Sequence, residues 1–138
     1  MRRRGRECAL QMLYTADVCS LNNEQIKEAF WRTTAVLKET KDFAEMLFEG
    51  VREQLENIDQ LVTDYAQNWE LKRMAAIDRC ILRLATYELL HCKEVPVKVV
   101  INEAVDLAKL YSTLDSGKFV NGVLDKIKLV ITKGCQTS

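Results

Sequence analysis

The stretch KRMAAIDRCILRLATYELLHC, residues 72–92, decides the fold of this 138-residue chain. At about 100° per residue, its apolar side chains cover most of the circumference of a helix. The remaining polar strip is narrow, with Arg79, Arg83 and Thr86 at its centre and Asp78 at one edge. A helix with so little polar surface is expected to run through the middle of the molecule, and the rest of the chain must cover it.

One carboxylate, Glu88, falls on the apolar side of this helix. A carboxylate there needs a cation or several N–H donors if it stays charged. It could be a catalytic acid with a raised pKa. We favour a structural carboxylate that pairs with an arginine, because no second catalytic group lies nearby in the sequence.

Apolar residues recur at helical spacing through almost the whole chain, which has one proline and five glycines. The strict alternation typical of strands is absent, so the predicted fold class is all-α. About seven helices are expected near residues 3–20, 23–38, 41–57, 58–67, 72–92, 96–111 and 116–131.

Several residues mark the expected helix ends. Asn22 and Gln25 predict a capping box, Asn57 a break, and Pro96 the first turn of a helix. No long linker, low-complexity tract or repeat separates the helices. We therefore expect one domain over residues 1–138, built from two small helical subdomains that share one core. Their approximate ranges are 1–57 and 58–138.

Four arginines, Arg2, Arg3, Arg4 and Arg6, crowd the start of the first predicted helix. A helix start already carries partial positive charge, so cations there cost stability and a polyanion is the expected partner. Phosphate suits both the guanidinium groups and the helix end, which favours nucleic acid. The alternative is a solubilising or disordered arm, and a short basic cluster is weakly specific.

The polar side of the same helix carries Gln11 and Tyr14, opposite the apolar stripe of Ala9, Met12 and Leu13. Tyr14 is therefore expected to face solvent. An aromatic ring beside arginines suits stacking on an unpaired base, as in single-stranded nucleic acid binding. The alternative is that Tyr14 covers a neighbouring helix.

A second candidate anion site opens the last predicted helix, where Asp115 or Ser116 is the expected N-cap and Lys118 lies in the first turn. Phe119 could stack on a base and Asn121 could read a base edge. Taken alone, this segment favours the other interpretation, in which Phe119 is a core residue. It is not a phosphate-binding P-loop, since the glycine, hydroxyl and strand that this motif needs are missing.

Charge is unevenly distributed although the formal net charge is zero. Residues 1–20 sum to +2, residues 21–70 to −6 with five basic against eleven acidic side chains, and residues 71–138 to +4. If the fold brings the two chain ends together, they form one basic face. The acidic middle would then limit nonspecific binding to polyanions.

Other functional classes find little support. The chain has five cysteines without C-x-x-C spacing and a single histidine, His91, so neither a zinc site nor a nucleophile–histidine–carboxylate set is expected. No apolar run approaches the length of a membrane span and no signal-type segment is evident. We expect a cytoplasmic, non-enzymatic protein without metal or cofactor.

Four segments together resemble the bacterial transcription antitermination factor NusB family, in order and spacing. They are RGRECALQMLY (residues 4–14), IDRCILRLATYEL (77–89), VINEAVDLAK (100–109) and DSGKFVNGVL (115–124). The resemblance covers essentially the whole chain, is strongest from about 57 to 127, and rests on length and helical pattern alone across 21–56.

This resemblance implies an RNA-binding antitermination factor that acts with the ribosomal protein NusE. Together they would bind single-stranded boxA-type RNA in nascent transcripts, including leaders of ribosomal RNA operons, and promote read-through by RNA polymerase in an antitermination complex. The free protein is expected to be a monomer or weak homodimer.

The resemblance also implies which residues face the RNA, and raises Phe119 from core residue to base contact. The candidate RNA-binding residues are Arg2, Arg3, Arg4, Arg6, Gln11, Tyr14, Asp115, Ser116, Lys118, Phe119 and Asn121. Asp78, together with Arg79, is expected on the side of the protein partner.

Two alternatives stay open at this point. The N-terminal domain of an RNA cytosine methyltransferase resembles this fold, so the chain could be an RNA-binding accessory domain of such a system. The 138 residues contain neither the glycine-rich methyl-donor motif nor the catalytic cysteine that the enzyme needs. A purely structural helical adaptor is the other alternative, which RNA-binding measurements at two salt concentrations would distinguish.

Overall fold

The computed structural model describes residues 2–66 and 70–137, with side chains up to residue 131, and this part of the chain holds seven α-helices and no strand. The all-α prediction is confirmed. The helices are α1 Arg2–Val18, α2 Asn23–Thr33, α3 Lys38–Glu53, α4 Leu55–Tyr65, α5 Ala76–His91, α6 Val97–Tyr111 and α7 Leu114–Thr137, with a short 3₁₀ turn, η1, at Leu71–Arg73. Residues 67–69, between the helices predicted near 58–67 and 72–92, lie outside the described residues.

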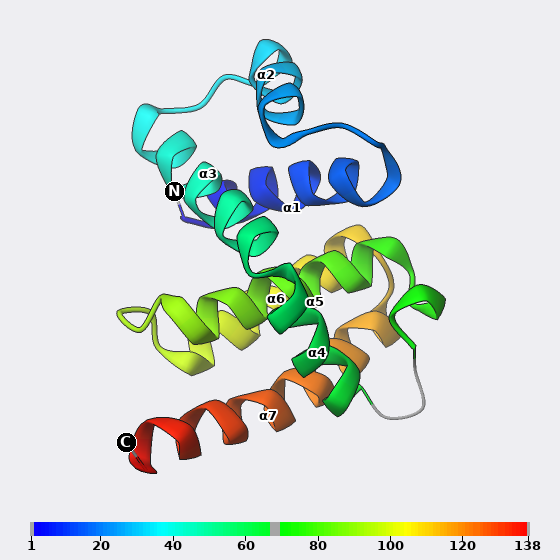
Figure 1. The fold of residues 1–138 in the computed structure, drawn as a ribbon, viewed down its shortest axis with the longest axis vertical. Helices are drawn as coiled ribbons and strands as arrows, with labels where there is room; N and C mark the ends of the chain where they lie inside the picture. Colours follow the sequence, from blue (N-terminus) through cyan, green and yellow to red (C-terminus); the bar gives the residue numbers. More distant parts are fainter. Residues whose placement is uncertain (1, 67–69, 138) are drawn as a thin grey trace.

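Helix α5 lies at the centre, as its apolar circumference predicts. It packs against α1, α3, α4, α6 and α7 (Figure 1). Cys80, Ile81, Leu82 and Leu84 of α5 are almost completely buried. Burial of such side chains from water is the main term that stabilises a helical domain of this size.

The first three helices form the upper part of the molecule in Figure 1, and α4 to α7 form the lower part. Helix α1 joins the two parts, because one side of it contacts α2 and α3 while the other contacts α5. Buried residues of both parts belong to a single apolar cluster, which extends from Cys8 in α1 to Ile127 in α7.

Two glycines allow unusually close helix packing. A Cβ atom on Gly5 of α1 would lie 2.6 Å from the Phe43 ring of α3, and one on Gly50 of α3 would lie 2.2 Å from the Tyr87 ring of α5. Both distances are shorter than a real Cβ contact, so a larger residue at either position would force the aromatic ring or the helix to shift. The aromatic rings occupy the space that the missing side chains leave.

Several predicted boundaries shift. The predicted helix 72–92 is split, because Met74 and Ala75 are extended between η1 and α5. Arg79 stabilises this junction, since its Nη1 donates hydrogen bonds to the carbonyl oxygens of Leu71, at 2.6 Å, and Met74, at 3.1 Å. The break after α3 comes at Gln54 rather than at Asn57.

Of the two N-terminal helix caps predicted from side chains, one is confirmed and one is wrong. The capping box is confirmed, since Asn22 Oδ1 accepts from the Gln25 N–H at 2.8 Å and Gln25 Oε1 accepts from the Asn22 N–H at 2.9 Å. The expected N-cap of the last helix, Asp115 or Ser116, is wrong. The helix begins at Leu114, and Thr113 Oγ1 accepts the Ser116 N–H at 3.0 Å.

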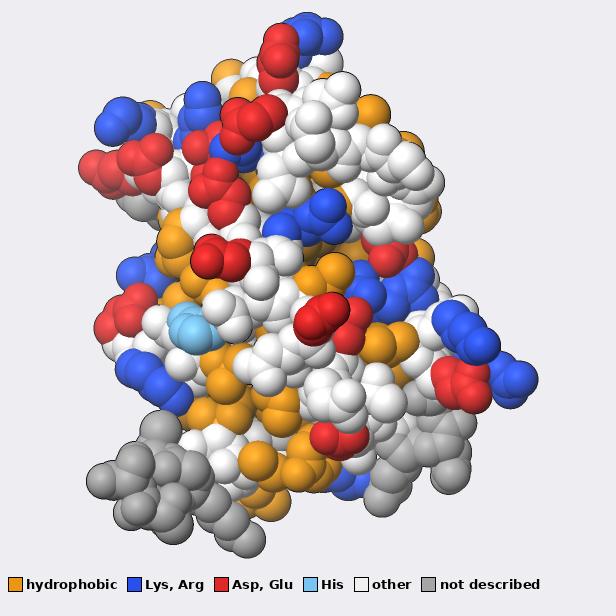
Figure 2. Space-filling view, in the orientation of Figure 1, with side chains coloured by type: hydrophobic (Ala, Val, Ile, Leu, Met, Phe, Trp, Pro, Cys, Tyr) orange, Lys and Arg blue, Asp and Glu red, His pale blue; other side chains and the backbone are white. Residues whose placement is uncertain are grey.

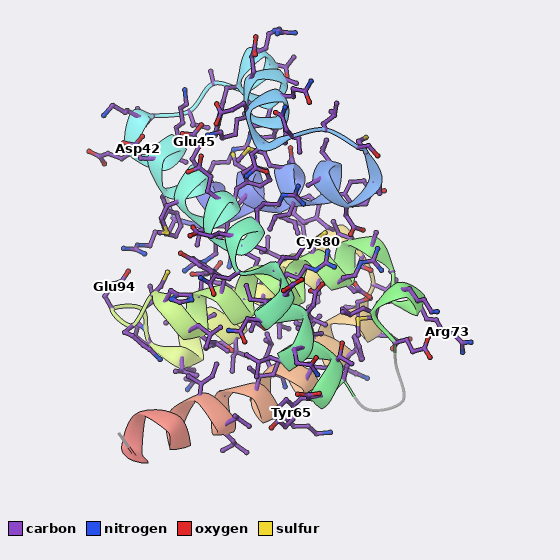
Figure 3. All side chains as sticks on the ribbon, in the orientation of Figure 1. Asp42, Glu45, Tyr65, Arg73, Cys80 and Glu94 are labelled. Atoms are coloured by element: carbon purple, nitrogen blue, oxygen red, sulfur yellow. The ribbon has the colours of Figure 1, made fainter. Side chains whose placement is uncertain are left out.

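Carboxylates gather over α2 and α3 on the face shown in Figure 2, which agrees with the acidic charge of residues 21–70. Asp42 and Glu45 of α3 belong to this acidic region (Figure 3). Apolar surface lies lower on the same face, around and below the only histidine. In the described residues, no helix has the length and apolar character that a membrane crossing requires.

The cysteines with described side chains are free thiols, of which Cys8, Cys80 and Cys92 are buried and Cys19 is exposed. Burial raises the pKa of Cys80 to about 12 and that of Cys92 to about 11. Such thiols stay protonated at neutral pH and act as small apolar core residues.

Candidate nucleic-acid interface

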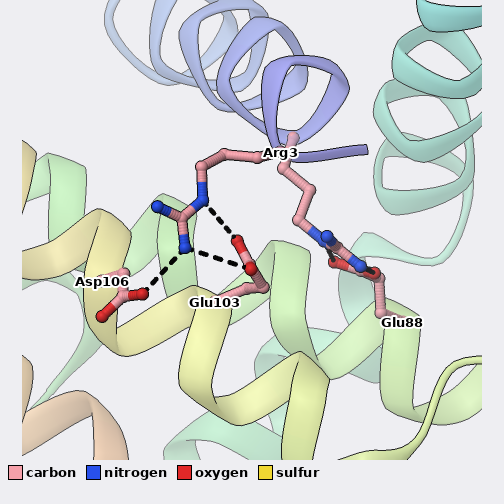
Figure 4. A network of polar contacts seen from close by, with 5 residues as sticks. Arg3, Glu88, Glu103 and Asp106 are labelled. Atoms are coloured by element: carbon pink, nitrogen blue, oxygen red, sulfur yellow. Dashed lines mark hydrogen bonds and ion pairs between the residues drawn. The ribbon is translucent and has the colours of Figure 1, made fainter. Parts of the chain in front are cut away.

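Three of the four N-terminal arginines lie on the surface of α1. Arg3 bridges to α6, with Nε 2.9 Å from Glu103 Oε2 and Nη2 2.8 Å from Asp106 Oδ2 (Figure 4). Arg4 and Arg2 are also exposed. Arg2 stacks over the Phe43 ring, 4.9 Å from its centroid. All three guanidinium groups are accessible to a ligand, although the Glu103 and Asp106 carboxylates would compete with that ligand for Arg3.

Arg6 lies in the interior, contrary to its expected role as a phosphate contact. It is 3% exposed and pairs with Glu88 of α5, which is 2% exposed. Arg6 Nε lies 2.9 Å from Glu88 Oε2, and Arg6 Nη2 lies 2.8 Å from Glu88 Oε1. The prediction that Glu88 pairs with an arginine is confirmed. Arg6 precedes Ala9 by three residues and Leu13 by seven, and this spacing already placed it on the apolar stripe.

Tyr14 is 42% exposed, as its helical phase predicts. It lines a groove of about 540 Å³ between α1, the start of α5 and the end of α6, which we call the tyrosine groove. The lining residues are Leu10, Gln11, Tyr14, Thr15, Ala75, Ala76, Ile77 and Tyr111.

Sequence reasoning missed Tyr111. Its position continues the helical stripe of Ala104, Leu107 and Ala108, all of which are buried, so the pattern alone would place Tyr111 in the core. It is instead 39% exposed, because α6 ends at this residue and the chain turns away toward α7. The only sequence signal is its place at the end of a helix.

A second groove, of about 460 Å³, adjoins the first, because Ala75 lines both. We call it the Phe119 groove, since the half-buried Phe119 ring forms part of its wall. Its lining residues are Met74, Ala75, Asp78, Thr113, Asp115, Ser116 and Phe119. The fold thus brings Tyr14 near the C-terminal end of α1 and Phe119 in the first turns of α7 to two neighbouring grooves.

Phe119 also separates the Phe119 groove from a smaller hollow of about 210 Å³ that Lys118, Lys126 and Tyr65 line. Lys118 and Asn121 are exposed on α7. The ring is therefore neither a fully buried core residue nor freely exposed. Lys118 and Lys126 thus place cationic side chains of α7 next to the Phe119 ring.

Asp78 and Arg79, the residues expected on the partner side, are both used inside the fold. Asp78 is 8% exposed and accepts a hydrogen bond of 2.9 Å from Ser116 Oγ. Arg79 pairs with Asp17 of α1 and donates to backbone carbonyl groups of the η1–α5 junction. Asp78 was expected on the partner side of the protein and outside the core. The structure corrects this expectation, because α7 packs over Asp78 and buries it.

Asp17 holds two arginines of α5 against the C-terminal end of α1. Besides Arg79, it pairs with Arg83 Nη1 at 2.9 Å, and Arg83 Nε reaches Asp59 Oδ1 of α4 at 2.7 Å. Burial opposes the charged form of Asp17, but the hydrogen bonds from Arg79 and Arg83 outweigh it and hold the pKa of Asp17 below its usual value. This network links α1, α4 and α5 to one another.

Comparison with known proteins agrees on one family. A sequence model of the NusB family matches residues 3–128. The chain is similar to the transcription antitermination protein NusB of Anaeromyxobacter dehalogenans, with 47% identity over 91% of this chain and 89% of that protein. It is also similar to the structure of T. maritima NusB, with 42% identity, a TM-score of 0.84, and coverage of 93% of this chain and 90% of that one.

A third similarity is to the crystal structure of the antitermination factors NusB and NusE in complex with dsRNA. The matched chain is 28% identical, with a TM-score of 0.86 and coverage of 94% of this chain and 96% of that chain.

Proposed function

This chain belongs to the NusB family, and we propose that it is an RNA-binding transcription antitermination factor rather than an enzyme. With the ribosomal protein NusE, it binds boxA-type single-stranded RNA in nascent transcripts, including leaders of ribosomal RNA operons. Bound there, the pair promotes read-through by RNA polymerase. This role would place the protein in the cytoplasm.

The observation that carries the proposal is the pair of adjoining grooves, each lined by an aromatic ring from a helix that also carries exposed cations. The exposed Tyr14 lines one groove and lies on α1, the helix that also carries the exposed Arg2, Arg3 and Arg4. The half-buried Phe119 lines the other groove and follows the exposed Lys118 on α7. Proteins hold single strands by stacking bases on aromatic rings and neutralising phosphates with Lys and Arg. Folded RNA helices offer no unstacked base for such a surface, so we assign it to single strands.

The residues divide by role. Arg2, Arg3 and Arg4 hold phosphates, while Tyr14 and Phe119 stack on bases. Gln11 in the tyrosine groove, Asp115 in the Phe119 groove and the exposed Asn121 of α7 accept or donate hydrogen bonds at base edges. Arg6 has no direct RNA role, since its guanidinium is buried against Glu88.

NusE is the proposed protein partner, as in the NusB–NusE–dsRNA structure to which this chain is similar. The side chains of Asp78 and Arg79 act inside the fold, so direct partner contacts must come from neighbouring exposed residues. A change at Asp78 would affect partner binding through the packing of α7.

Titration of a labelled single-stranded boxA-type RNA tests this function. The protein is added alone and with NusE, at about 50 and 200 mM salt, and a scrambled strand and a duplex of the same sequence are the controls. We expect the boxA strand to bind more tightly than either control, and NusE to increase its affinity. The affinity should fall by about 0.7 log units per log unit of salt concentration for each phosphate contact. Equal affinity for boxA and scrambled strands, or no binding with NusE present, would refute the proposal.

A further inference from the structure

We propose that Tyr111 is a second base-stacking residue, and that an unpaired nucleobase of the bound RNA occupies the tyrosine groove against Tyr111 as well as Tyr14. The inference rests on the proposed RNA-binding function and adds a base site to it. Two tyrosines from different helices, 42% and 39% exposed, line this one groove.

A stripe along α1 leads from the arginines into this groove. Arg4, Glu7, Gln11 and Tyr14 follow one another at spacings of three, four and three residues, which puts them on one face of the helix. At 1.5 Å per residue, Arg4 and Tyr14 are separated by about 15 Å along the axis. A strand whose phosphate is held at Arg4 can therefore present a base near Gln11 and Tyr14.

Glu7 connects the stripe to Tyr111. Arg4 Nη1 donates to Glu7 Oε1 at 3.3 Å. Burial, and then the negative charge and hydrogen bond of Glu7, raise the pKa of Tyr111. The phenol therefore stays protonated at neutral pH, so its hydroxyl group can donate a hydrogen bond.

The chemistry of the groove suits a nucleobase. Its apolar wall consists of Leu10, Ala75, Ala76 and Ile77 besides the rings, while Gln11 and Thr15 supply amide and hydroxyl groups. An amide side chain can pair with a base edge through both its donor and its acceptor. The groove continues through Ala75 into the Phe119 groove, so the next base along the strand meets Phe119.

The first test compares three variants in titrations of the boxA-type strand. Tyr111→Leu keeps apolar bulk but removes the ring, and we expect it to weaken binding about 5- to 150-fold. Tyr111→Phe keeps the ring and should stay within about 3-fold of wild type, because stacking remains. The matched control is Leu110→Ala, a change at the adjacent and more exposed side chain, which should bind normally. Thermal unfolding verifies that each variant is folded.

The second test uses the wild-type protein. Strands with 4-thiouridine at successive positions are irradiated in the complex and the crosslinked peptides are identified by mass spectrometry. We expect one position to crosslink to peptides that contain Tyr14 and Tyr111. Normal RNA affinity of folded Tyr111→Leu, or crosslinks to Tyr14 without any to Tyr111, would overturn the inference while leaving the proposed function intact. No binding of the strand by wild type would instead refute the function itself.

Discussion

Arg6 in the first turns of α1 and Glu88 in the last turns of α5 form a buried, doubly hydrogen-bonded ion pair across 82 positions of sequence. Neither charge has water to solvate it, so each depends on the other. The pair fixes the start of α1, and with it the exposed Arg2, Arg3 and Arg4. It explains why a basic helix start contains one arginine that cannot reach a ligand.

Loss of Arg6 is therefore expected to unfold the protein rather than to weaken RNA contact directly. Arg6→Ala leaves Glu88 buried and unpaired, which should lower the free energy of unfolding by about 3–5 kcal/mol. Arg4→Ala is the control and should change stability by less than about 1 kcal/mol while reducing RNA affinity. Urea unfolding measures the first effect. Wild-type stability in Arg6→Ala would show that the ion pair is not needed.

Arg3 should become a better RNA ligand when its carboxylate partners are removed. In the double variant Glu103→Gln, Asp106→Asn, the guanidinium is released from both carboxylates that hold it. Because Glu103 and Asp106 compete with phosphate for Arg3 in the wild-type protein, we expect the salt slope of RNA binding to steepen by up to about 0.7, the full value of one phosphate contact. Glu28→Gln with Asp42→Asn removes two carboxylates from α2 and α3 as a charge-matched control. If both double variants change the slope equally, the effect is one of net charge alone and Arg3 makes no phosphate contact.

Phe119→Ala should reduce RNA affinity more than stability, because the ring is half-buried and borders two hollows. Removal of a stacking ring costs about 1–3 kcal/mol of binding free energy, whereas truncation of a fully buried phenylalanine costs about 3–5 kcal/mol of folding free energy. Paired RNA titrations and urea melts measure the two quantities. A stability loss in the core range with unchanged affinity would assign Phe119 to the core.

Asp17 should make stability depend on pH in acid. Its pKa is lower in the folded protein, so as pH falls the unfolded chain binds a proton first, near pH 3.9. The stabilisation is complete above that value and is lost as pH falls through the folded pKa. We expect Asp17→Asn to be less stable than wild type by about 1–3 kcal/mol at pH 7, and the gap to shrink below about pH 4. A gap that widens in acid would contradict this assignment.

Patterns within single helices were predictable from the sequence. The nearly complete apolar circumference of residues 72–92 predicted the central helix, and the phase of Tyr14 predicted its exposure. The Asn22–Gln25 capping box also depends only on local spacing. These features follow from helix geometry, which the sequence specifies directly.

Features that depend on contacts between helices were not predictable in the same way. Glu88 was expected to pair with an arginine, but only the fold selects Arg6. Asp78 lies at the edge of a polar strip in projection, yet α7 covers it. Tyr111 continues a buried stripe and is exposed only because α6 ends there. In each case a distant segment decides the environment.

The most direct test of the RNA-binding surface is a titration of isotope-labelled protein with the boxA-type strand, followed by backbone amide NMR shifts. We predict the largest shifts at the exposed face of α1, at residues 74–77 around the η1–α5 junction, and from Tyr111 to Asn121. Amides of α2 and of the acidic outer face of α3 should be unchanged. Shifts concentrated on α2 and α3, with none along the two grooves, would contradict the account.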